Sequence, residues 1–509
     1  MIGRRSRAAA LAAAALAGMA HVGSPNTYFE GAAGPYRIRV IVRPPGIVPG
    51  QADITVRFLD GRRAERVLVQ PLRGGRPTAL EPPPDTATSV PGDPMLYGAR
   101  LWLMEGGAYS VRVLVTGAAG EGTAIVPVNS LATRRLGFSV PLAAVLLVLG
   151  AVLVIGAISI VGAAAHESVL APGEEPDRPR SIRAWWARAV AALLLGLGVL
   201  GGKQWWNGED ALHTRTLFQP MRVATTIADS NGARHLQLAI SDSDWIAHRY
   251  TPLIPDHGKL MHLFLIRSDV EALAHLHPLM RDSSAFHASL PPVPPGWYRV
   301  YADVVHESGF TQTLVDSVTV APIPQHRAAD AWQPSDPDDA WWESSGPGGG
   351  ALDRFVELPD RSAISWLQDT TPLTAGRDLE LRFAVTGPDA KPTVLERYMG
   401  MPSHAVIARE DGAVFVHLHA AGTIAMASQL VYELRQPGDT VRGLLGRRIT
   451  EAGSSGHDLG PSVSDPGIVS FPYAFPQPGR YRLWVQVKRQ GRILTGAFDA
   501  DVGPPTAPS

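Results

Sequence analysis

The chain has 509 residues, of which 18% are charged, a formal net charge of −1 and no cysteine. The lack of cysteine excludes disulfides, iron–sulfur clusters, thiolate zinc sites, c-type haem attachment and blue-copper centres, so any metal must be held by His, Met, Asp or Glu. The balanced charge, with no basic tract, argues against nucleic acid as a partner. The length suggests about three or four domains, and 51 Gly and 44 Pro favour loop-rich β domains.

The first 20 residues have the pattern of a secretory signal peptide. A basic start precedes a short Ala/Leu run and the small-x-small sequence Gly18-Met19-Ala20. Cleavage there would make His21 the mature N-terminus, where its α-amino group and ring could chelate Cu(II), although we favour an ordinary mature start. An uncleaved anchor is the other interpretation of residues 1–20. With the lack of cysteine, the pattern predicts a bacterial extracytoplasmic location.

Two apolar stretches, residues 138–165 and 185–206, predict transmembrane helices. The first has no charged residue and the second has a tryptophan pair at each end, which suits the two membrane interfaces. The segment between them, 166–184, is then a cytoplasmic loop. We therefore expect a protein of the bacterial inner (cytoplasmic) membrane, with large domains in the periplasm or extracytoplasmic space.

The exported parts carry a strand pattern three times. The stretches ADITVRF, HLQLAI and LELRFAV alternate apolar and polar residues, as half-buried strands do. Each has a later partner strand that opens with Gly and then Tyr (Tyr109, Tyr298 and Tyr481), a feature of immunoglobulin-like sandwiches. The sequence thus predicts a mainly β protein with three immunoglobulin-like β-sandwich domains and two transmembrane helices. The predicted domains are 28–127, 211–323 and 351–505, with a linker at 324–350.

Two stretches share the pattern H-x12-H-x-H, once in each of the last two predicted domains. They contain His262, His275 and His277, and then His404, His417 and His419. Asp411-Gly412 signals a two-residue type I′ hairpin, which pairs residues whose numbers sum to 823. The three later histidines then share one face of a hairpin. The earlier stretch predicts the same arrangement around a turn at Asp269-Val270.

Three neutral imidazoles that converge on a sheet face suit copper, zinc, nickel or iron. The stretch YMGMPSH adds Met399 and Met401, whose thioether sulfurs favour Cu(I). We expect copper, with zinc as the alternative. The competing interpretation is a packed cluster of structural histidines, whose spacing was copied by duplication for packing alone. His257, His287 and His306 could supplement the first triad, but the sequence does not fix their direction.

The sequence has no nucleophile elbow, P-loop or HExxH motif. Asp303 and Glu307 could act as acid or base near the first triad, without being specific. We therefore leave an enzymatic role open and do not favour it.

The stretch YMGMPSHAVIAREDGAVFVHLHAAGT resembles a group of bacterial membrane-anchored exported proteins with a YMGMxxH…FVHLH motif. Their typical version reads HLHP-x-GT, where this chain has Ala420 in place of the proline. The stretch ending HLHP at Pro278 looks like the partner motif. This resemblance implies no particular activity. More loosely, the His- and Met-bearing β domains resemble periplasmic copper carriers of the CopC and YtkA-like kind, from which this chain departs because its candidate ligands lie within one hairpin.

The sequence therefore favours a membrane-anchored extracytoplasmic metal-binding protein in metal homeostasis or delivery, with copper as the expected metal. Its partner would be a metal acceptor or another envelope protein. The alternative is a non-metal β-sandwich scaffold that binds an envelope protein. In that case backbone or carboxylate partners should satisfy the histidines. A third hypothesis is a metalloenzyme with an open position on three histidines, which needs a pocket with a carboxylate beside the triad.

Overall fold

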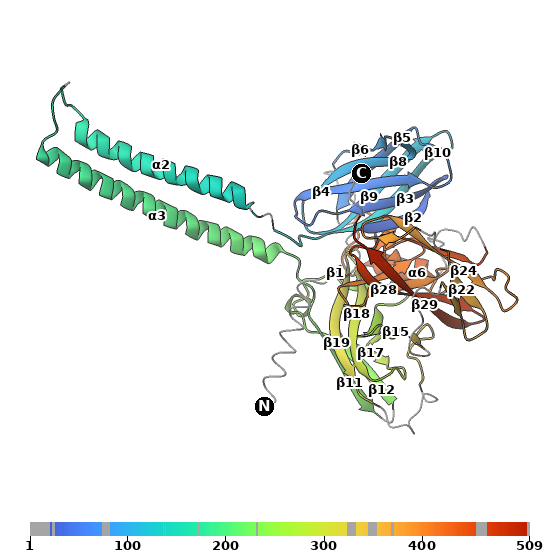
Figure 1. The fold of residues 1–509 in the computed structure, drawn as a ribbon. Helices are drawn as coiled ribbons and strands as arrows, with labels where there is room; N and C mark the ends of the chain where they lie inside the picture. The colour runs from blue at the N-terminus through green and yellow to red at the C-terminus, as the bar shows by residue number, and fades with distance from the viewer. Residues whose placement is uncertain are drawn as a thin grey trace. The chain divides into compact units, whose positions relative to one another are not determined.

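The computed structural model is mainly β, with several antiparallel sheets and two long apolar helices (Figure 1). It describes residues 21–505 except 23–25, 74–81, 136, 138, 172, 231–232, 323–331, 345–353, 368–370 and 455–465. The predicted signal peptide, residues 1–20, lies outside the described residues.

The first β region has a five-stranded sheet, β2-β3-β4-β8-β7, and a four-stranded sheet, β10-β9-β5-β6. Its strands are β2 (Thr27–Ala33), β3 (Tyr36–Arg43), β4 (Gly50–Phe58), β5 (Arg66–Arg73), β6 (Asp85–Thr86), β7 (Thr88–Val90), β8 (Asp93–Leu103), β9 (Gly107–Gly117) and β10 (Gly120–Ser130). One apolar cluster contains Val40 of β3 and Val113 of β9, so the two sheets share a core. The predicted alternation holds in β4, where Ile54, Val56 and Phe58 are buried.

The helices α2 (Val140–Glu167) and α3 (Arg178–Thr216) form a unit of their own and lie side by side (Figure 1). Asp177 caps the N-terminus of α3 with its side chain. Both helices are long and apolar enough to cross a membrane. At ~1.5 Å per residue, α3 is ~58 Å long, well beyond the ~30 Å of a hydrocarbon core.

The helix α3 extends past the predicted span 185–206 at both ends. The predicted boundaries followed the apolar residues, whereas the helix begins at its Asp177 cap and continues through polar residues after Trp206. Part of the predicted loop 166–184 is therefore helical. The predicted start of the second β domain, at residue 211, is also wrong, because α3 ends at Thr216.

The second β region follows the helices. Its elements are β11 (Val223–Ser230), β12 (Ala233–Ile240), α4 (Ser243–Ile246), β13 (Leu253–Ile254), β14 (His262–Arg267), β15 (Ala272–Leu276), β16 (Leu279–Met280), β17 (Ala285–Ser289), β18 (Gly296–His306), β19 (Thr311–Val320) and β20 (Ala340–Glu343). One sheet has the order β11-β12-β17-β16. The other has the order β13-β18-β14-β15-β20, with β19 also paired to β18. Leu238 and Leu263, from the two sheets, belong to one apolar core.

The strand β20 corrects the predicted linker 324–350. Residues 340–343 pair with β15, with Ala340 opposite His275, and so extend the sheet that carries the first histidine hairpin. The sequence did not reveal this strand, because it is only four residues long and lies in a Pro- and Asp-rich segment, a composition typical of linkers. The described part of this segment also supplies Asp336 and Asp339 next to the histidines.

The third β region completes the described chain. Its elements are β21 (Phe355–Glu357), β22 (Ala363–Trp366), β23 (Leu373–Thr374), β24 (Leu379–Thr386), β25 (His404–Arg409), β26 (Val414–His419), α5 (Met426–Leu434), α6 (Leu444–Ser454), β27 (Ile468–Tyr473), β28 (Gly479–Arg489) and β29 (Arg492–Gly503). Its sheets have the orders β21-β22-β24-β27 and β1-β26-β25-β28-β29-β23, where β1 is His21–Val22. Phe383 and Leu483, from the two sheets, share one core.

The three repeated tyrosines occupy matching places in β9, β18 and β28. The hydroxyls of Tyr298 and Tyr481 each donate to the backbone carbonyl four positions earlier, at 2.7 Å. The hydroxyl of Tyr109 accepts from the backbone amide four positions earlier, at 3.2 Å. All three rings are buried. The repeat seen in the sequence is thus a repeated local structure.

Candidate metal centre

The second histidine hairpin has the predicted register. His404 lies opposite His419, and Val406 lies opposite His417. Alternate residues of a strand point to the same side of a sheet, so the three histidines share a face. All three side chains are buried.

The turn of this hairpin is not the predicted type I′ turn. That turn needs positive φ at both central residues. Gly412 has φ of 76°, but Asp411 is not among the positive-φ residues. The Asp411 carboxylate instead accepts from the backbone amide of Ala413 at 2.9 Å and from the Arg409 guanidinium at 2.8 Å. The register is therefore kept by an aspartate-based turn with one left-handed residue.

The first hairpin uses the same device, although its turn sequence differs. Its register is as predicted, with Phe264 opposite His275. Asp269 accepts from the Arg267 guanidinium at 2.8 Å, and Val270 takes the left-handed position with φ of 58°. A β-branched residue in this conformation costs ~1–3 kcal/mol. The shared turn explains why the spacing of 13 positions is the same in both hairpins.

The two hairpins face each other across an apolar interface between the second and third β regions. Residues 256–277 correspond to 398–419 at a constant offset of 142 positions, the difference between His404 and His262. The rings of Tyr301 and Phe415 stack at 4.1 Å between centroids. The interface cluster consists of Phe264, Ile266, Val270, Leu273, Tyr301, Val406, Ala408, Phe415 and Trp484.

The middle histidine of each hairpin reaches a polar side chain of the other β region. Nδ1 of His275 lies 2.8 Å from Oε1 of Gln486, and Nδ1 of His417 lies 3.4 Å from a carboxylate oxygen of Asp303. Gln486 and Asp303 both sit on the strand that pairs with the first histidine of their own hairpin, directly opposite that histidine. The contacts thus cross the interface in both directions, as a local twofold pseudosymmetry requires.

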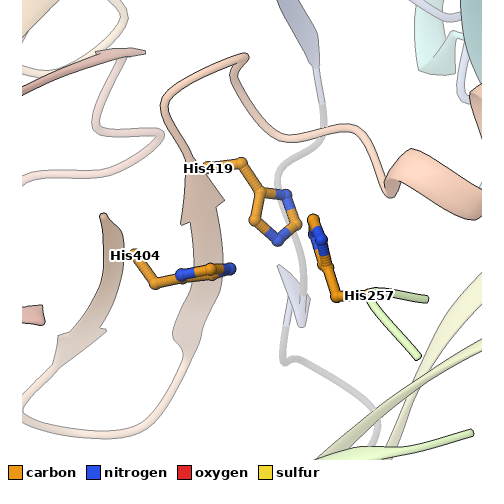
Figure 2. A group of neighbouring side chains, drawn as sticks. All are labelled: His257, His404 and His419. Carbon is orange, nitrogen blue, oxygen red and sulfur yellow. The ribbon is translucent and has the colours of Figure 1, made fainter. Parts of the chain in front are cut away.

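The interface brings the two predicted triads into one cluster. His417 lies between them, with its ring centroid 4.6 Å from that of His419 and 5.4 Å from those of His262 and His404. Two sets of ring nitrogens converge, each with all ligand atoms within 4.8 Å of one another. Group 1 is His262, His275 and His277. Group 2 is His257, His404 and His419 (Figure 2).

Group 2 corrects the predicted triad, because His257 replaces His417 in it. His257 comes from a turn of the second β region and points at His404 and His419 of the third (Figure 2). The sequence named His257 only as a supplement to the first triad. It missed this partner because the contact depends on packing between domains.

The other two supplementary histidines lie apart from both groups. His306 stacks on Tyr250 at 5.4 Å between centroids, and its Nδ1 lies 2.9 Å from the carbonyl of Thr251. His287 sits in β17, opposite Gln237. Neither belongs to group 1 or group 2.

Most histidines of the cluster are fixed through one nitrogen while the other has no partner among the described residues. Nδ1 of His277 lies 3.0 Å from Asp339, and Nδ1 of His419 donates to the carbonyl of Ile424 at 2.8 Å. The ring of His257 donates to the backbone carbonyl of Met399. The buried nitrogens left without a hydrogen-bond partner are Nε2 of His257, His277, His417 and His419, and both ring nitrogens of His404.

The histidines are held in their neutral form. Burial lowers the pKa of His257 and of His419 to about 4. Burial, followed by the neighbouring histidines, lowers the pKa of His404 and His417 well below the usual value. Neutral imidazole is the form that binds a metal ion.

Two carboxylates lie beside the rings. Burial raises the pKa of Asp303 to about 7, against the effect of the hydrogen bond that Thr313 donates to it. Burial also raises the pKa of Asp256, whose carboxylate accepts from the backbone amide of Ala427 at 2.7 Å. Asp256 lies 4.0 Å from Nε2 of His257. Glu307, the other predicted acid or base, accepts instead from the backbone amide of Arg442.

The predicted sulfur ligands, Met399 and Met401, are both buried. Met401 packs in a small apolar group with Ala421 and Met426. Met399 is 8% exposed, and its carbonyl accepts from the His257 ring. His21 lies further from the cluster. Its backbone pairs with Val414, which precedes His419 by five residues, a distance of ~16 Å along the strand at ~3.3 Å per residue.

The first β region also reaches group 2. The loop after β26 pairs with β2, where Thr423 donates its backbone amide to the carbonyl of Tyr28 at 3.0 Å. The next residue, Ile424, packs in the core of the first region. Its carbonyl is the acceptor that fixes His419. The position of a group 2 histidine therefore depends on contacts of the first region.

The cluster is enclosed. Even His257, which is not among the fully buried residues, exposes only 6% of its side chain, and the ring of His404 is fully buried. Two carboxylates lie nearby, namely Asp256, which is buried, and Asp303, which exposes 26% of its side chain.

The comparisons with known proteins name no activity. The model of a family described as a domain of unknown function (DUF8832) matches residues 221–321 and 360–503, which include both histidine hairpins. No curated protein matches the sequence.

Among solved structures, a tetra-tandem repeat from the extending region of a large adhesion protein is 9% identical. It has a TM-score of 0.14, with 89% of this chain and 71% of that chain covered. Salmonella alpha-2-macroglobulin reacted with methylamine is 10% identical (TM-score 0.19; 95% and 24% covered). The FN1–FN3 domains of chicken CNTN1 are 8% identical (TM-score 0.13; 91% and 97% covered). Such low TM-scores carry no argument on fold or function.

Proposed function

We propose that this chain is a membrane-anchored extracytoplasmic protein that binds metal ions at groups 1 and 2 and serves metal homeostasis or delivery. Copper is the proposed metal, and zinc is the alternative. A metal acceptor or another envelope protein is the proposed partner. The two apolar helices are the proposed anchor in the inner membrane, and the signal peptide is the proposed export signal.

The observation that carries the proposal is the set of unpartnered nitrogens. Six buried ring nitrogens of the cluster have no hydrogen-bond partner among the described residues. Each buried polar atom left unpaired costs ~1–3 kcal/mol, so the cluster as a whole is expensive for a fold whose stability is only ~5–15 kcal/mol. Metal ions at the two groups would take one lone pair each from His257, His277, His404 and His419, and so would remove most of the cost. A purely structural role would leave it in place.

The second support is the way the rings are fixed. A metal-binding histidine usually donates its other ring N–H to a carboxylate or a backbone carbonyl, which sets its tautomer and orientation. His277 has Asp339 in this role and His419 has the carbonyl of Ile424. The alternative of a non-metal scaffold requires both nitrogens of each ring to be satisfied, which these two rings do not meet.

Copper is favoured by the ligand types. Imidazole binds Cu, Zn, Ni and Fe, and among divalent ions copper binds most strongly to a given set of nitrogen ligands. Met399 and Met401 are buried in the stretch that leads into His404, and thioether sulfur favours Cu(I). An enclosed site suits storage or transfer better than turnover, so we propose a carrier and not an enzyme.

The finer architecture is also part of the proposal. Three pairs of sheets, each around its own core and each with a buried tyrosine bonded to the backbone four residues earlier, support three immunoglobulin-like β-sandwiches. The two sandwiches that carry the hairpins would act as one metal-binding body.

The test is a metal titration of the full chain purified in detergent. Cu(I), Cu(II) and Zn(II) are added in competition with a chromophoric chelator, and bound metal is measured by mass spectrometry. We expect about two ions per chain, one per group. The double variants His262→Ala/His277→Ala and His404→Ala/His419→Ala should each lose about one ion.

The matched control is His235→Ala/His287→Ala, which removes two histidines from the second β region outside both groups. It should keep the full metal content. If the parent chain binds no more metal than a variant without the six histidines of the two groups, the proposal is wrong and the scaffold alternative replaces it.

A further inference from the structure

A second pair of equivalent turns flanks the histidine cluster. Residues 256–259 and 398–401 both form tight turns in which the first and last residues exchange two backbone hydrogen bonds. The second residue of each turn is left-handed, with φ of 50° at His257 and 49° at Met399. A glycine follows in both, with φ of 80° and 79°. The two turns therefore share one backbone conformation.

His257 and Met399 thus occupy the same place in the two β regions. They are 142 positions apart, the same offset as between His262 and His404. His257 crosses the interface to complete group 2 with His404 and His419 (Figure 2). The local twofold pseudosymmetry relates His257 to Met399. It also relates His404 and His419 of group 2 to His262 and His277 of group 1.

We propose that the sulfur of Met399 is a metal ligand of group 1, supplied across the interface from the third β region. Each group then takes two histidines from one hairpin and one ligand from the turn of the opposite region, with His275 as a further ligand of group 1. This inference rests on the proposed function. It differs from the sequence-based prediction, which assigned Met399 to the histidines of its own hairpin.

The surroundings of the two methionines support this assignment. Met401 is 2% exposed and packs with Ala421 and Met426, so its side chain has an ordinary apolar role. Met399 is also buried, at 8% exposed, but it belongs to none of the apolar clusters formed by the described residues. The hydrogen bond from the His257 ring to its carbonyl places its backbone at the cluster.

The chemical consequence is a difference between the groups. Thioether sulfur is soft and selects Cu(I), whereas a set of three imidazoles binds Cu(II) and Zn(II) well. Group 1 would therefore hold Cu(I) more tightly than group 2 does. Group 2 would discriminate less between copper and zinc.

The test compares Met399→Leu with Met401→Leu in the full chain. Leucine keeps the apolar volume and is not β-branched, so both variants should fold. X-ray absorption of the Cu(I)-loaded parent should show sulfur in the coordination shell. This signal should disappear in Met399→Leu and persist in Met401→Leu. The Cu(I) affinity of Met399→Leu should fall at least about tenfold, while its Zn(II) content stays the same.

A second variant, Met399→His, gives group 1 the same type of ligand across the interface as group 2 has in His257. It should gain Zn(II) affinity at group 1 and lose the sulfur signal. If Met399→Leu keeps both the sulfur signal and the Cu(I) affinity, or if Met401→Leu loses them instead, the inference is wrong while metal binding stands. If neither the parent nor His262→Ala/His277→Ala binds any of the metals, the proposed function fails as well.

Discussion

The carboxylate of Asp303 in the second β region lies 3.4 Å from Nδ1 of His417 in the third. In the equivalent contact the roles of the regions are exchanged: Nδ1 of His275 in the second region lies 2.8 Å from Oε1 of Gln486 in the third. These two contacts join the regions at the histidine cluster. They also mean that one histidine of each hairpin, His275 and His417, is oriented by a residue of the other region.

The contact predicts an effect of Asp303→Leu on metal binding. Leucine fills the space but removes the carboxylate beside His417. The His417 ring lies against His419 of group 2 and His262 of group 1, so both groups can shift, and we expect metal affinity to fall by up to about tenfold. Asp303→Asn should have a smaller effect, because its amide oxygen can still accept from His417. Competition titration with a chelator measures both. Asp316→Leu, in the adjacent strand β19, is the control and should bind like the parent; equal affinities for Asp303→Leu and the parent would contradict the role of Asp303.

The ionisation of Asp303 predicts a pH effect on the metal-free protein. Its pKa is raised to about 7 in the fold from 3.8, because the surrounding protein desolvates the carboxyl group, although 26% of the side chain stays exposed. The folded state therefore binds a proton that the unfolded state has released, and folding stability falls as pH rises from about 4 to about 7 through this group. Asp303→Asn should stabilise the metal-free chain at pH 8 by roughly 4 kcal/mol at most. Denaturant unfolding at pH 5 and pH 8 tests this, and an equal gain at both pH values would count against it.

The histidines act in the opposite direction. Burial lowers the pKa of His257 and His419 to about 4. Below the unfolded value of about 6.5, the unfolded state binds protons that the folded state rejects, so stability is lost as pH falls from about 6.5 to about 4. The loss is roughly 3 kcal/mol for each of the two histidines. The histidines of the cluster outnumber the carboxylates with raised pKa, so the metal-free chain should unfold more easily at pH 5 than at pH 7.

Denaturant unfolding of the metal-free chain between pH 7 and pH 5 measures this dependence. Bound metal should reduce it, because coordinated histidines do not take up protons until the ion leaves. A metal-free chain with the same stability at both pH values would show that the rings are not buried as neutral groups.

The loop that joins group 2 to the first β region predicts the effect of Gly422→Ala. A Cβ at this position would lie 2.1 Å from the carbonyl oxygen of Tyr28, and the residue has φ of 115°. The substitution should displace the loop that carries the carbonyl of Ile424, and with it the anchor of His419. We expect a stability loss of more than about 2 kcal/mol and weaker metal binding at group 2, measured by unfolding and titration.

The matched control is Gly438→Ala, where φ is also positive, at 87°, but nothing lies within 4 Å of the added Cβ. It should show the backbone strain alone and leave metal binding unchanged. If Gly438→Ala and Gly422→Ala behave alike, contact with the first region does not position His419.

The chain's lack of cysteine makes its proposed topology easy to test. Ser168 lies between α2 and α3, and Ser283 lies in the second β region; both are exposed. In cells whose outer membrane is permeabilised and whose inner membrane is intact, a membrane-impermeant maleimide should label Ser283→Cys. It should label Ser168→Cys only after the inner membrane is opened. The reverse pattern would contradict an extracytoplasmic metal centre.

The sequence was sufficient to predict the two histidine hairpins, but not that they pack against each other. Both registers follow from the histidine spacing and the turn aspartates, Asp269 and Asp411, because strand pairing is local. The turn type was wrong because a side chain of Asp411, and not a second left-handed residue, closes the turn. The two long apolar stretches located both helices, whereas the start of α3 depends on its cap.

The role of His257 could not be derived in the same way. It joins His404 and His419 only because two domains pack face to face, and single-strand periodicity carries no information about such contacts. One signal was available. The tetrapeptides DHGK and YMGM lie at the same offset as the two triads and would have revealed the equivalence of His257 and Met399.

The most direct test of metal binding at the histidine cluster is anomalous diffraction from crystals of the copper-loaded chain. Data recorded above and below the copper edge should give peaks within bonding distance of the ring nitrogens of His257, His404 and His419, and of His262, His275 and His277. Zinc-loaded crystals should give the group 2 peak at the zinc edge. Loaded crystals with no peak at either group, in a chain whose histidine rings are ordered, would contradict the account.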